Sequence, residues 1–197
     1  MRLRQILRQT LRPIALMLAT VLVPALALAQ SGDALIRQVG AGPEIAVITF
    51  PASKSLIYKM AWHATVGPED PAAPAPSFRA PANFLWMADR EQLPRRSLHL
   101  AIIVHGTATH SLMKNDAYKA LRGVDNGSIA LLTALHEAGV QIIVCGAALV
   151  NRNVPRESLL PFVKIAQTAG MAHATLAAEG YTIITPYARR EIGRAHV

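Results

Sequence analysis

A short apolar run at residues 140–144, which ends in Cys145 and a glycine, constrains the fold more than any other part of the 197-residue chain. The run is too short for an ordinary helix and is rich in β-branched residues, so it predicts a buried strand. A second apolar run, at residues 98–104, ends in His105 and a glycine. Buried strands of this kind are typical of parallel sheets, in which ligands bind where the strands end.

Segments with helical spacing separate the predicted strands. Helices are predicted over residues 82–92, 111–121, 128–138 and 171–179. Further strands are predicted over residues 56–66, 162–165 and 181–185. Strands that alternate with helices predict a single α/β domain, with a mostly parallel sheet covered on both faces.

Three other segments have less regular patterns. Residues 45–50 are apolar and predict either an edge strand or an extended arm. Five prolines between residues 68 and 81 predict an exposed loop. Residues 155–161 begin and end with proline, which predicts one or two helical turns.

The first 29 residues have the pattern of a secretory signal. Four arginines precede an apolar run that ends in Ala27-Leu28-Ala29, the small-x-small pattern that signal peptidase cleaves. An uncleaved membrane anchor is the alternative, but the run is shorter than the roughly 20 residues of a spanning helix and Pro24 interrupts it. We therefore expect a mature protein that begins at Gln30, in the periplasm or outside the cell.

The expected layout is a signal peptide over residues 1–29, an N-terminal arm over 30–55, an α/β domain over 56–186 and a tail over 187–197. The end of the tail resembles the translation of an artificial adapter sequence, so His196 is given no role.

The charge pattern argues against two classes of partner. The signal holds four of the 20 Lys and Arg residues and none of the 12 acids, so its removal lowers the formal net charge from +8 to +4. The remaining cations are scattered and form no basic stripe with aromatics, so we expect no nucleic-acid partner and, after cleavage, no membrane contact. The sequence has no glycine-rich phosphate loop, no GxSxG motif and no paired-carboxylate pattern, and we expect no cofactor.

Cys145 is the only cysteine in the chain, so it has no partner for an internal disulfide. In an oxidising compartment such a thiol is either buried and inert or kept for its reactivity. Arg152 and Arg156 follow closely in sequence, and a helical turn that begins at Gly146 would direct backbone N–H groups at the sulfur. Both features would favour the thiolate.

Histidines are the other candidates for chemistry. His105 should lie beside Cys145 if their strands are neighbours, where it would orient or deprotonate the thiol; otherwise it is a histidine bonded to a loop. His110 and Asn151 are further candidates at the same rim, and His63 is another. One cysteine and scattered histidines are a weak signal for a metal, so no metal site is assigned. The remaining histidines are expected on the surface: His99, His136 and His173.

A set of spaced short motifs resembles the DsrE/DsrF-like family. They are the strand that ends in His105, the helix ending in LTALHEAG at residues 132–139, the strand that ends in Cys145, ESLLP at 157–161, and residues 177–186. The resemblance covers residues 56–186. It implies a three-layer α/β/α fold with a five-stranded parallel sheet, assembly as homotrimers or homohexamers, and, in the sulfur-relay members, a cysteine that carries sulfur as a persulfide.

Cys145 matches that cysteine in position. The resemblance therefore predicts a periplasmic sulfur carrier or sulfurtransferase-like protein, whose donor and acceptor are proteins or small thiols. Two alternatives remain: a module that binds a metal or small ligand at a His/Cys rim, and a structural oligomer with an inert cysteine.

Overall fold

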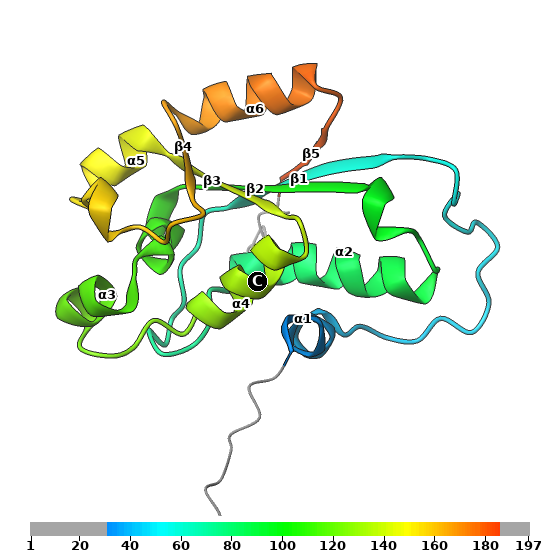
Figure 1. Ribbon diagram of the computed structural model, residues 1–197, viewed down its shortest axis with the longest axis horizontal. Coiled ribbons are helices and arrows are strands. Elements are labelled where there is room, and N and C mark those ends of the chain that lie inside the picture. Colours follow the sequence, from blue (N-terminus) through cyan, green and yellow to red (C-terminus); the bar gives the residue numbers. More distant parts are fainter. Residues whose placement is uncertain (1–30, 186–197) are drawn as a thin grey trace, which may run out of the picture.

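Five parallel strands form one sheet in the computed structural model, which describes residues 31–185 (Figure 1). The sheet order is β4-β3-β2-β1-β5. The strands are β1 Tyr58–Ala64, β2 Leu98–Val104, β3 Gln141–Cys145, β4 Lys164–Ala166 and β5 Thr182–Ile184. All the predicted strands of the domain are present, and the sheet is wholly rather than mostly parallel. The predicted signal and tail lie outside the described residues.

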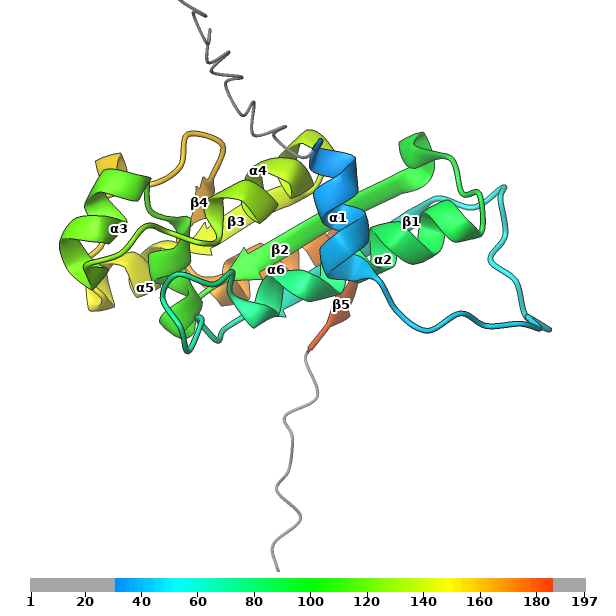
Figure 2. The ribbon, with the colours of Figure 1, turned by 90° about the horizontal axis from the view of Figure 1, so that it is seen from below.

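Helices cover both faces of the sheet, which gives the expected three-layer α/β/α fold (Figure 1). The α-helices are α1 Gly32–Gly40, α2 Arg79–Arg90, α3 Asn115–Arg122, α4 Ile129–Glu137, α5 Gly146–Asn151 and α6 Ala169–Ala178. Four 3₁₀ segments occupy Pro76–Phe78, Arg95–Ser97, Gly106–Leu112 and Arg156–Ser158. Helices α2 and α4 lie under one face, and α6 lies over the other (Figures 1 and 2). Within the described part of the chain, no helix is both long enough and apolar enough to cross a membrane.

Alternate residues of each strand enter two separate cores. Trp62, Ile102 and Val144 face α2 and α4 in the larger core. Ala61, Ala101 and Ile103 face α6 in the smaller one, where a single helix covers the sheet. Side chains alternate between the two faces along a strand. Cys145 is two residues after Ile143, which packs in the smaller core, so Cys145 lies on the same face as α6.

The structure differs from the sequence predictions in three segments. The predicted arm begins with a helix, α1, whose buried Ile36 joins the larger core, so only residues 41–57 lie outside helix and strand before β1. Pro81 lies in the first turn of α2 instead of in the preceding loop, a position where proline is tolerated because its missing N–H has no partner there. The helix predicted over 111–121 starts at Asn115, since a 3₁₀ segment precedes it.

Candidate functional site

The register of the three central strands brings the predicted site residues together. Val104 of β2 pairs with Val144 of β3, and the two strands are parallel neighbours as expected. His105 comes directly after Val104, and Cys145 comes directly after Val144. Both residues therefore lie at the carboxyl edge of the sheet. His63 lies on β1, the strand on the other side of β2. The backbone N–H of His105 donates a hydrogen bond of 3.0 Å to the carbonyl of Ala64, which follows His63.

The glycine after each site residue has a steric reason. Gly106 has a φ of +62°, and a Cβ there would lie 2.5 Å from the carbonyl oxygen of Thr65. A Cβ on Gly146 would lie 2.9 Å from the carbonyl oxygen of Ala166 in the neighbouring strand β4. Both positions therefore exclude larger residues, and both let the chain leave the sheet sharply behind His105 and Cys145.

Cys145 lies at the wall of a small pocket of about 380 Å³. The pocket is lined by His105, Gly106, Cys145, Ala147, Ala148, Asn151 and Arg152. Its cation is Arg152, at the end of the helix that begins directly after Cys145. Cys145 is only 7% exposed, so the pocket is the route by which a reagent reaches the sulfur.

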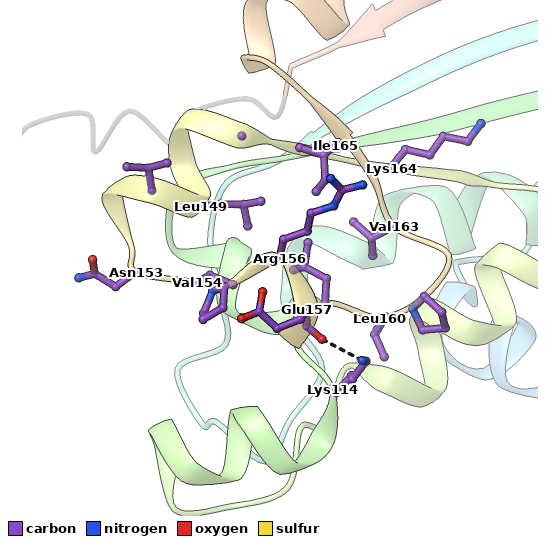
Figure 3. A pocket seen from close by; sticks show the side chains of 15 residues that line it. Lys114, Leu149, Asn153, Val154, Arg156, Glu157, Leu160, Val163, Lys164 and Ile165 are labelled. Atoms are coloured by element: carbon purple, nitrogen blue, oxygen red, sulfur yellow. Dashed lines mark hydrogen bonds between the residues drawn. The ribbon is translucent and has the colours of Figure 1, made fainter.

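Two predicted rim residues do not line the pocket of Cys145. Arg156 lines a second and larger pocket, together with Leu149 and Ile165, rather than the pocket of Cys145 (Figure 3). His110 is bonded to Arg122 at 3.3 Å. Because a guanidinium only donates, His110 Nδ1 accepts this bond. His110 also bonds to the backbone of Arg152, so it lies next to the pocket of Cys145 without lining it.

Three histidines from three elements form a cluster beside the pocket. His63 Nδ1 lies 3.2 Å from His105 Nε2, so one ring donates a hydrogen bond to the other. The rings of His63 and His173 meet edge to face, with their centroids 3.8 Å apart. His105 is the member that also lines the Cys145 pocket, and it therefore connects the cluster to the thiol.

The expectation that His173 is an ordinary surface residue was wrong. Its Nε2 is buried without a hydrogen-bond partner, as is Nε2 of His63. The sequence contains a signal for the burial of His173. It is four residues after Ala169 and three before Leu176, which places the three residues on one face of a helix. Ala169 and Leu176 both pack in the smaller core. His99 and His136 are on the surface as expected.

Burial keeps this cluster in its neutral form. Desolvation, followed by the nearby rings of His173 and His105, lowers the pKa of His63 from 6.5 to about 4. Desolvation also lowers the pKa of His105, and desolvation and His105 lower the pKa of His173. A neutral imidazole has a lone pair on one ring nitrogen, which is the form a base requires. On His105 this nitrogen is Nδ1, and free, when Nε2 donates the bond to His63.

The cluster does not have the geometry of a metal centre. Among residues 31–185, no three side chains of His, Cys, Asp or Glu are arranged to hold a metal ion.

The lowered pKa of His63 predicts a loss of stability in mild acid. Between about pH 6.5 and about pH 4 the unfolded chain binds a proton at this residue that the folded protein excludes, so the free energy of unfolding falls as the pH falls. We expect His63→Gln to lose less stability than the wild type between pH 7 and pH 5 in urea unfolding. Part of the loss will remain, because His105 and His173 also have lowered pKa values. Equal losses in both proteins would contradict the burial of a neutral His63.

Comparisons with known proteins identify one family and two similar solved structures. The profile of the DsrE/DsrF-like family matches residues 66–186. Two solved structures are similar: a protein of unknown function, MTH1491, from Methanobacterium thermoautotrophicum (15% identity, TM-score 0.43) and the ychN protein from E. coli (20% identity, TM-score 0.46). Each alignment covers 66% of this chain and 99% of the other. No curated protein matches the chain significantly.

Proposed function

Because the chain belongs to the DsrE/DsrF-like family, which is associated with sulfur relay, we propose that it carries sulfane sulfur as a persulfide on Cys145. One observation carries this proposal: the only thiol of the chain lies in a pocket that also contains a histidine and an arginine. An inert structural cysteine has no need of either neighbour. A nucleophilic one needs a base and a group that stabilises anions.

The transfer needs no oxidant or reductant. The Cys145 thiolate attacks the terminal sulfur of a donor persulfide, the donor S–S bond breaks, and the donor leaves as a thiolate. Cys145 then holds the sulfur as Cys–S–S⁻. An acceptor thiolate attacks the outer sulfur in turn, and Cys145 leaves as a thiolate. With no second cysteine in the chain, the acceptor is another protein or a small thiol.

His105 and Arg152 have separate roles in this proposal. His105, held neutral by burial, takes the proton from the Cys145 thiol. Arg152 attracts the anionic donor and stabilises the persulfide charge, because a guanidinium donates charge-assisted hydrogen bonds to anions. Asn151 supplies a further donor at the rim.

The proposal includes export and self-association. The arginine-rich start, the apolar run and Ala27-Leu28-Ala29 support a periplasmic protein that begins at Gln30. An unpaired thiol there remains available to sulfane sulfur, whereas paired cysteines would be consumed in disulfides. Homotrimers or homohexamers are the assemblies that the family resemblance favours.

Mass spectrometry after incubation with inorganic polysulfide tests the proposal. We expect a mass gain of whole sulfur atoms on the peptide that contains Cys145, and its reversal by a small thiol. Cys145→Ser should gain no sulfur while it keeps the thermal stability of the wild type. Two results would sink the carrier function: a native protein that takes up no sulfur, which favours the inert cysteine, or stoichiometric zinc or copper that blocks the thiol, which favours a binding module.

A matched pair of arginine variants tests the pocket assignment. Arg152→Gln removes the cation that lines the Cys145 pocket, so we expect sulfur loading to slow by about tenfold, the effect of losing one charge-assisted contact. Arg156→Gln removes an equal charge from a different pocket and should change the rate by less than about twofold. Equal effects in both variants would mean that only general electrostatics acts on the thiol.

A further inference from the structure

An exposed apolar arm follows the first helix and lies outside the site described above. Residues 43–57 form neither helix nor strand, and several of their large side chains face solvent. Phe50 is 95% exposed and Val47 is 75% exposed. The others are Ile45, Ile48, Leu56 and Ile57. A soluble protein seldom exposes such a continuous apolar segment unless another surface covers it.

The arm is tied at two points to the C-terminal end of α2, and the apolar side chains between these points are exposed. Glu44 pairs with Arg90 at 3.0 Å, and the backbone N–H of Ala52 donates to Glu91 Oε2 over 2.6 Å. Residues 45–50 between these points have the β-branched and aromatic composition of a strand. They pair with no strand among the described residues of their own chain.

A groove of about 1240 Å³ on the same molecule has the complementary character (Figure 3). It runs beside β4, an outer strand of the sheet whose free edge has no strand partner among residues 31–185. Leu149, Val163 and Ile165 line it, and Ile165 is 40% exposed. An open strand edge beside an apolar groove is the surface to which an extended segment adds as a further strand.

The arm and the groove lie at opposite ends of the molecule (Figures 1 and 2). The arm of one chain therefore does not reach its own groove, and only another molecule brings the two surfaces together. We propose that residues 45–50 of one copy occupy the groove beside β4 of a neighbouring copy. Such a head-to-tail contact closes into a ring when its rotation permits.

Charge favours a second copy over a membrane surface as the occupant. The groove contains Lys114 and Lys164 along with Arg156, against one acid, Glu157. Residues 45–50 carry no charge, and the neighbouring Glu44 is paired with Arg90 of its own chain, so the segment brings no cation that the groove would repel. Segments that lie on anionic membranes are instead rich in Lys and Arg.

This contact would also adjoin the candidate site. Gly146, which follows Cys145, is one of the residues that line the groove. The arm of a neighbour would thus pack against the turn that positions the thiol. The contact itself does not depend on sulfur transfer, so the two proposals stand or fall separately.

Light scattering on single and mixed variants tests the contact. We expect the wild type to be oligomeric at micromolar concentration, and both Val47→Asp in the arm and Ile165→Asp in the groove to be monomeric. Leu121→Asp changes an exposed leucine on α3, outside both surfaces, and should keep the wild-type mass. Circular dichroism and thermal unfolding check that each variant is folded.

The mixture of the two monomeric variants gives the sharpest result. The arm variant keeps a wild-type groove and the groove variant keeps a wild-type arm, so one intact contact forms and a dimer of one copy each should appear. A mixture that stays monomeric would overturn the arm-in-groove contact, as would a monomeric wild type or variants that keep the oligomeric mass. Binding of the wild type, but not Val47→Asp, to phosphatidylglycerol vesicles with no oligomer would assign the arm to a membrane instead.

Discussion

Parallel pairing of β1, β2 and β3 is the constraint on which the rest of this structure depends. Parallel strands end at the same edge of a sheet, and alternation of side chains then decides which of the two faces each terminal residue joins. His63, His105 and Cys145 come from three separate segments, yet this register places them on one face of the sheet near its carboxyl edge, with His63 level with Ile103 and the other two residues two positions further on. A shift of one residue in either pair would move one of these residues to the opposite core.

The two faces of the sheet are covered to different extents by helices, and the three residues lie on the less covered face. The face toward α2 and α4 is filled by large apolar side chains, whereas the other has a smaller core under α6 alone. Polar rings fit there with only partial hydrogen bonding, and their desolvation keeps them neutral. The proposed site thus combines a mostly buried thiol with a histidine that burial keeps neutral. Keeping the histidines neutral costs stability in acid, but a neutral imidazole is the form that the proposed proton transfer from Cys145 requires.

The sequence predicted those features that depend on local pattern. Apolar runs marked the central strands, and the residues that end them, His105 and Cys145, proved to share an edge because parallel strands require it. Contacts made through tertiary structure were harder to predict. Arg152 and Arg156 both follow Cys145 closely in sequence, but Arg152 caps the end of α5 whereas Arg156 begins the next 3₁₀ segment, and they line different pockets. His173 was missed because its partner, His63, is 110 residues away in sequence and is met only through the docking of α6.

The central claim is that Cys145 reacts in the folded protein through its pocket. Alkylation of the native protein by iodoacetamide, followed over a range of reagent concentrations, tests this claim most directly. If the claim is right, the rate rises in proportion to reagent concentration, and it falls when His105 is replaced by Gln. If Cys145 is instead an inert core residue, modification waits for the chain to open, and at high reagent concentration the rate levels off at the rate of unfolding.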